Sequence, residues 1–168
     1  LYFWPASETA RVEVPVLKSI IKIQGNAKGA PQHIHIQGFT ITGCEGTAVE
    51  ISGANNILIA GNTIFNASGH GIAVRNGSKN SVMGNDIYEV GDTGIVVSGG
   101  DRKTLKPARH RIENNYIHHT GRFQKNSSGI ECVGVGNIVA HNLIHSTPRI
   151  GILFDGNDHL IEYNHVHH

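Results

Sequence analysis

The sequence repeats one short pattern of aliphatic residues and asparagine at intervals of roughly 22–24 residues. In each copy an inward aliphatic residue is followed by two residues, an asparagine, one residue and a second inward aliphatic residue. The copies lie at 59–64, 82–87, 112–117, 139–144 and 161–166, and an earlier copy at 36–41 has Phe39 in the asparagine position. Alternation with a period of two predicts β-strands, and a repeat of this length predicts a solenoid.

A second pattern, glycine followed by alternating inward and outward residues, comes after each copy of the first. It occurs at 71–74, 94–97, 129–132 and 151–154, with a degenerate member at 48–51. The 21 glycines and the charged content of only 16% suit short strands joined by tight corners better than helices. One turn cannot bury its own aliphatic residues, so it must bury them against the turns above and below. We therefore predict an all-β fold, a right-handed single-stranded parallel β-helix of about six rungs.

The repeated asparagines are predicted to form a ladder at one corner of the coil. Each side-chain amide can donate to the amide of the next turn and to the backbone of the corner, so these inward polar groups stay hydrogen-bonded. We interpret them as structural residues and not as a binding site. The members are Asn62, Asn85, Asn115, Asn142 and Asn164.

Two turns are longer than the rest and predict loops that project from the coil. The extra residues fall at 99–109 and 121–128, which are polar and contain glycine or proline. Loops on a rigid solenoid are where binding and catalytic residues concentrate. Residues 20–168 are predicted to form the coil, and residues 1–19 to form lead-in strands that partly cover its first rung.

Charge, hydropathy and cysteine content exclude several classes of protein. The formal net charge is +1 with 12 histidines, so we expect no nucleic-acid partner. No apolar run approaches the ~20 residues needed to span a bilayer, so we expect no membrane partner either. The register places Cys44 and Cys132 three rungs apart, or about 14 Å at ~4.8 Å per strand. A disulfide needs Cα atoms within about 7 Å, so both are predicted to be free thiols.

Three segments carry a resemblance to a known family: LYFWP at 1–5, GDTGIVVSGGDRKTLKPARH at 91–110, and GVGNIVAHNLIHSTPRIGILFDGNDHLIEYNHVHH at 134–168. They resemble β-helix glycoside hydrolases with fucosidase and xylanase members, and more distantly pectate lyases and polygalacturonases. The resemblance implies that a substrate lies along the outer face of the strand that carries the glycine pattern. In such enzymes the coil continues through further carboxylate-rich rungs, so we expect this chain to be a segment of a longer, secreted protein, extracellular or periplasmic.

The outer face of that strand carries the candidate site residues. Hydrolysis of a glycoside needs two carboxyl groups about 5–9.5 Å apart. Glu131 and Asp155 are one rung apart and two residues across, with Cα atoms expected at about 8 Å, so they are the predicted catalytic pair. The alternative is that these are ordinary solvated surface acids. The predicted substrate-binding residues are Glu50, Arg75, Asp92, Asp101 and Arg102.

Histidines form a second outward column. His118, His145 and His167 continue a column that begins with Phe65 and Tyr88, and His119 and His168 lie beside it. Imidazoles about 4.8 Å apart stack like any side-chain ladder. A straight column does not converge on one point as a zinc site must, so we predict stacking, and neither a metal nor another cofactor.

Three hypotheses for function follow. The first is a carbohydrate-active segment that binds or hydrolyses an extracellular polysaccharide or oligosaccharide. The second is a structural solenoid that stacks end to end into a homo-oligomer or filament, because the end of a β-helix presents unpaired N–H and C=O groups. The third is a fragment of a longer enzyme, whose own ends say nothing about assembly.

Overall fold

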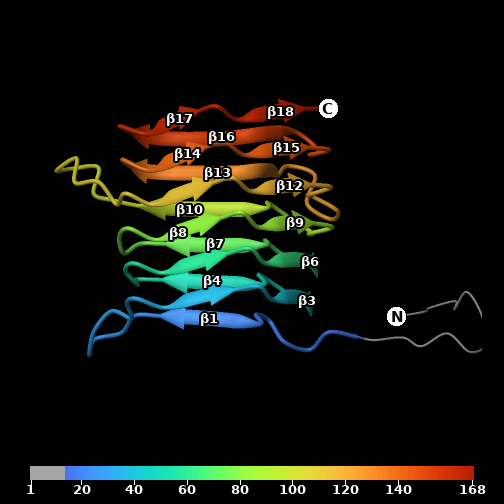
Figure 1. The fold of residues 1–168 in the computed structure, drawn as a ribbon, viewed down its shortest axis with the longest axis horizontal. Coiled ribbons are helices and arrows are strands. Elements are labelled where there is room, and N and C mark those ends of the chain that lie inside the picture. Colours follow the sequence, from blue (N-terminus) through green and yellow to red (C-terminus); the bar gives the residue numbers. More distant parts are fainter. Residues whose placement is uncertain (1–13) are drawn as a thin grey trace, which may run out of the picture.

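The computed structural model describes residues 14–168 as one stack of β-strand turns (Figure 1). The chain visits three parallel sheets in order, and each turn adds one strand to each sheet. The predicted parallel β-helix of about six rungs is therefore confirmed. Residues 14–19 form no strand, and the rest of the predicted lead-in segment lies outside the described residues. Nowhere in 14–168 is there a helix long and apolar enough to cross a membrane.

The three sheets contain six strands each. The first sheet carries the glycine pattern and consists of β1 (Ile21–Gln24), β4 (Val49–Ser52), β7 (Ile72–Arg75), β10 (Ile95–Gly99), β13 (Ser128–Val135) and β16 (Ile150–Asn157). The second consists of β2 (His35–Gln37), β5 (Leu58–Ala60), β8 (Ser81–Met83), β11 (Arg111–Glu113), β14 (Ile138–Ala140) and β17 (Leu160–Glu162). The third consists of β3 (Thr40–Cys44), β6 (Thr63–Ala67), β9 (Asp86–Tyr88), β12 (Tyr116–His118), β15 (Leu143–His145) and β18 (His165–His167).

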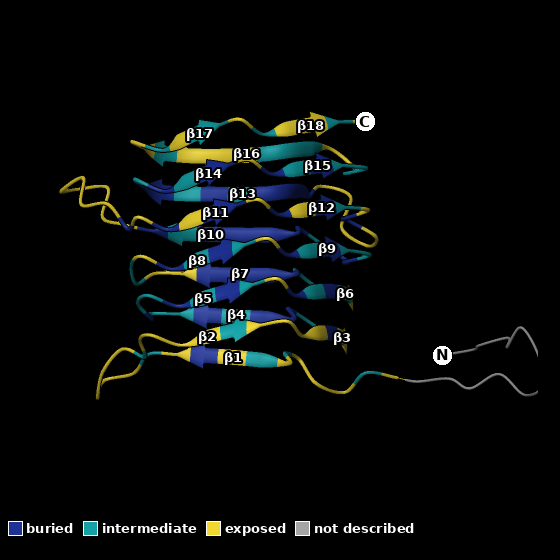
Figure 2. Ribbon diagram, in the orientation of Figure 1, coloured by how far each residue is buried: buried dark blue, intermediate teal, exposed yellow. Residues whose placement is uncertain are grey.

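Aliphatic side chains from successive turns form continuous columns in the interior. In the third sheet Ile64 pairs with Ile87, Ile87 with Ile117 and Ile117 with Ile144, and all four are fully buried. Figure 2 shows this burial through the middle turns and its loss on the last one. Each turn thus removes the aliphatic surface of its neighbours from water, which is the main driving force for this fold.

Close packing favours the glycine found at the start of four strands of the first sheet, β7, β10, β13 and β16. A Cβ on Gly94 would lie 2.6 Å from Ile117 Cγ2 and 2.7 Å from the carbonyl oxygen of Gly129, the equivalent residue one turn on. Gly71 meets the same two kinds of atom in the turn after it. A side chain at Gly71 or Gly94 would therefore push two turns apart or displace a core isoleucine, whereas the turn of β4 places Ala48 at the equivalent position.

The predicted asparagine ladder is confirmed. Each amide Nδ2 donates to Oδ1 of the next asparagine along the coil, at 2.9–3.0 Å for the four successive pairs from Asn62 to Asn164. The same Oδ1 also accepts the backbone N–H of the preceding asparagine. In the first turn this backbone donor is Phe39, which bonds to Asn62 Oδ1 at 3.0 Å.

A second ladder, which the sequence patterns did not reveal, lies at the corner before the second sheet. Here side-chain acceptors alternate between asparagine and histidine. Asn80 N–H donates to His110 Nδ1 at 3.2 Å, and His110 N–H donates to Asn137 Oδ1 at 3.3 Å. Asn137 N–H then donates to His159 Nδ1 at 3.2 Å. His110 is fully buried, and its Nε2 has no hydrogen-bond partner among residues 14–168. Burial lowers its pKa from 6.5 to about 4.

The two cysteines are free thiols, as predicted, and both are buried. Burial raises the pKa of Cys132 to about 11, with a hydrogen bond from Asn137 acting in the opposite direction. Burial likewise raises the pKa of Cys44. A thiol reacts as its thiolate, so burial disfavours reaction at both side chains.

Candidate functional site

The outer face of the first sheet has the predicted arrangement of side chains. One outward column runs through Glu50, Ala73, Val96, Glu131 and Leu153. The adjacent column runs through Ser52, Arg75, Ser98, Val133 and Asp155. On β10, in the middle of these columns, the outward residues are Val96 and Ser98. They separate the charged side chains of the earlier strands from those of the later strands.

The two long loops border this face at opposite ends of its strands. The loop after β10 projects from one side of the coil, and the loop before β13 lies on the other side (Figure 1). The second loop folds back on an earlier turn. Gly121 N–H donates to the Asp92 carbonyl at 2.9 Å, and Phe123 N–H donates to the Gly91 carbonyl at 3.0 Å. The two segments between strands border the face at the two ends of its strands, and they differ slightly from the predicted bounds, because Gly99 belongs to β10 and Ser128 to β13.

A histidine and an aspartate lie at the edge where the strands of this sheet begin. His70 Nδ1 is 3.7 Å from Asp92 Oδ2, and this nitrogen is buried without a hydrogen-bond partner among the described residues. Burial lowers the pKa of His70, whereas the carboxylate of Asp92 opposes that shift and the guanidinium of Arg75 reinforces it. Glu131 and Glu50 also act on this imidazole electrostatically. His70 thus lies among the predicted site residues, although the sequence analysis did not identify it.

The loop before β13 also forms a hollow that the sequence analysis missed. The hollow has a volume of about 350 Å³ and is lined by Asn66, Ala67, Ser68, Glu89, Arg122 and Phe123. The Phe123 ring is 73% exposed, and Arg122 Nε contacts Glu89 Oε2 at 2.9 Å. An exposed aromatic ring beside an ion pair and an amide offers both apolar and hydrogen-bonding surface to a ligand.

The remaining predicted residues differ in how far they are engaged within the protein. Arg102 of the loop after β10 reaches Asp155, with Nη1 and Oδ2 at 3.0 Å. Asp101 turns back into its own loop and accepts the Lys103 N–H at 2.9 Å, which lowers its pKa. Glu50 contacts Lys22 at 3.5 Å. Glu131, half-buried, has no ion pair among residues 14–168.

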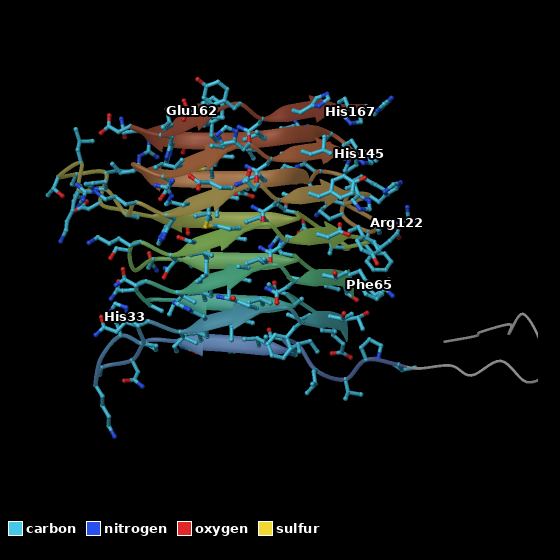
Figure 3. The ribbon with its side chains drawn as sticks, viewed as in Figure 1. His33, Phe65, Arg122, His145, Glu162 and His167 are labelled. Carbon is cyan, nitrogen blue, oxygen red and sulfur yellow. The ribbon has the colours of Figure 1, made fainter. Side chains whose placement is uncertain are left out.

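The outward column of the third sheet is confirmed as a continuous stack of rings. Successive centroids are 5.1, 5.0, 5.2 and 4.9 Å apart from Phe65 through Tyr88, His118 and His145 to His167, with interplanar angles of at most 19°. Phe65, His145 and His167 mark its course in Figure 3. The close packing of these rings affects the pKa of His145, which is lowered by partial burial and by the nearby His118 and His167.

Fold and surface together define a β-solenoid with a loop-bordered outer face. A family model described as "Right handed beta helix region" matches residues 18–167, and the chain belongs to this family. Comparisons with curated proteins and with solved structures found no match.

Proposed function

We propose that the outer face of the first sheet binds an oligosaccharide or polysaccharide between the two loops. The feature that supports this proposal is the combination of an extended, regularly spaced face with walls at both ends of its strands. Successive strands of this face are spaced at ~4.8 Å, and polar or charged side chains alternate with small and aliphatic ones along it. The exposed Phe123, in the loop that precedes β13, would stack on a sugar ring, and Glu131, Arg75 and His70 would hydrogen-bond the hydroxyl groups.

A more specific form of this proposal is that the same face also hydrolyses the bound polysaccharide. Glu131 and Asp155 occupy adjacent strands, one rung apart and two residues across. They would serve as the two carboxyl groups that glycoside hydrolysis needs. Arg102 would hold the Asp155 carboxylate in position. The proposal includes an extracellular or periplasmic location, where such polysaccharides occur, and carries over the resemblance to β-helix glycoside hydrolases.

Binding and cleavage are tested separately. Affinity electrophoresis through gels that contain plant or algal polysaccharides measures binding, and release of reducing ends measures cleavage. We expect retardation by at least one polysaccharide, and its loss when Arg75 and Glu131 are replaced by alanine. Glu131→Gln should abolish cleavage while preserving binding. Absence of retardation across a broad panel would reject the proposal as a whole.

End-to-end association is the second candidate function. The inward side chains of the last turn, Phe154 and Val166, are 60% and 47% exposed, whereas Cys132 and Ile144 directly beneath them are fully buried. A second copy stacked on this turn would cover both side chains and hydrogen-bond to the strands of the turn. Light scattering over a hundredfold concentration range tests this, and a constant monomer mass would reject it.

A further inference from the structure

Two pairs of adjacent histidines lie at the outer edge of the third sheet with their Nδ1 atoms facing each other. His118 Nδ1 is 2.8 Å from His119 Nδ1, and His167 and His168 make the same contact. The cause is the backbone, because His119 has a φ of 51°, in the left-handed region. This conformation turns the His119 side chain back beside the stacked ring of His118. Two facing imidazole nitrogens must share either a proton or a metal ion.

The surroundings of the first pair fix the orientation of His118. Its ring is stacked between Tyr88 and His145, at centroid distances of 5.0 and 5.2 Å. Its Nε2 lies 3.3 Å from Asp86 Oδ1. A histidine that ligates a metal commonly donates its other ring N–H to a carboxylate, which leaves the remaining nitrogen free to bind. Asp86 therefore directs the lone pair of His118 Nδ1 toward His119.

The second pair lacks this carboxylate. Asp86 lies on the strand one turn before His118. The corresponding position on the strand one turn before His167 is occupied by Leu143. A leucine cannot accept the N–H of His167, so its ring is less firmly oriented. The pair formed by His118 and His119 is therefore the stronger candidate of the two.

We propose that His118 and His119 form a solvent-open binding site for a divalent transition metal ion, with Cu²⁺ bound most tightly. Within residues 14–168 no cluster of three or more histidine, cysteine or acidic side chains is placed to enclose a metal, so water completes the coordination. Tetragonal coordination by two nitrogens and additional oxygens is typical of Cu²⁺, which also leads the divalent affinity series. Structural zinc sites use four protein ligands, so Zn²⁺ should bind more weakly.

The test is a calorimetric titration with CuCl₂ in the presence of glycine as a weak competitor, together with electron paramagnetic resonance. His119→Asn removes one ligand, and asparagine fits the backbone because Asn66 has a φ of 53° at the equivalent corner. We expect Cu²⁺ affinity to fall at least about tenfold, and Asp86→Asn to weaken it about 10–100-fold. The matched control is His141→Asn, since His141 is exposed and stacks on Tyr163 outside this column. Equal affinity for His119→Asn and His141→Asn would overturn the proposal.

A gain of binding provides an independent test that does not depend on loss of fold. Ser146 follows His145 as His119 follows His118, with a φ of 53° and its Oγ 2.9 Å from His145 Nδ1. Ser146→His should therefore create one more facing pair. We expect one additional Cu²⁺ per chain, with hyperfine coupling to two imidazole nitrogens. An unchanged stoichiometry would contradict the idea that the left-handed corner creates the site.

Discussion

The buried histidine of the second ladder should make the protein acid-sensitive by a calculable amount. His110 accepts the Asn80 N–H at Nδ1, so the folded protein requires its neutral form. Its pKa is about 4 when folded, compared with 6.5 when unfolded. Between these values the unfolded chain binds a proton that the folded chain does not, so stability falls as pH decreases. At 1.36 kcal/mol per pKa unit, the loss from pH 7.5 to 4 is about 3 kcal/mol from this residue.

His110→Asn isolates this contribution. Asparagine is the natural residue at the neighbouring ladder positions, Asn80 and Asn137, and its Oδ1 can accept the same N–H. The smaller side chain should lower the free energy of unfolding at pH 7.5 by about 1–2 kcal/mol through the cavity it leaves. Between pH 7.5 and pH 4, the unfolding free energy of the variant should therefore fall by about 3 kcal/mol less than that of the wild type.

The assay is urea unfolding of the wild type and His110→Asn at several pH values from 7.5 to 4. All other titrating groups are common to both proteins, so the difference between their curves reports His110 alone. The exposed His35 provides a control variant, His35→Asn, which should follow the wild-type curve. Parallel curves for the wild type and His110→Asn would refute the reasoning.

Three further predictions concern the ladder, the packing and the binding face. Asn115→Ala should lower the free energy of unfolding by about 3–5 kcal/mol, because it removes the acceptor of the buried Asn85 backbone N–H and breaks the ladder bonds on both sides of Asn115. Urea titration measures this change. Gly94→Ala should cost about 1–3 kcal/mol, because its Cβ would meet the Gly129 carbonyl, and an unchanged unfolding midpoint would contradict the packing argument. Phe123→Ala should weaken polysaccharide binding about tenfold, a loss of ~1.4 kcal/mol, while the unfolding midpoint stays constant. Equal retardation of the wild type and Phe123→Ala in affinity electrophoresis would exclude a role for this ring.

The sequence predicted those features that recur in every turn. A repeat of roughly 22–24 residues combined with strand alternation assigns each residue to a turn, a sheet and a face. The stack from Phe65 to His167 and the outward positions of Glu131 and Asp155 followed from this register alone. The chemical roles of Glu131 and Asp155 stay predictions, because register places side chains without stating what they bind.

The features that the sequence did not predict are those that break the repeat or change residue type within it. The second ladder uses asparagine and histidine interchangeably, since Oδ1 of one and Nδ1 of the other accept the same N–H, so no single letter recurs. Phe123 belongs to a loop whose fold-back depends on hydrogen bonds to Gly91, and no period encodes such a contact. His70 lies at a corner, where alternation between inward and outward residues no longer applies.

The asparagine ladder makes successive turns chemically interchangeable at their joints. Asn62 presents the same donor and acceptor to its neighbours as Asn85 does, and the two are separated by 23 residues. A gene that lost or duplicated one such unit would encode a coil with identical junctions and an altered length. Coil length is therefore a property that evolution or protein engineering can adjust in whole units, without redesigning the interior.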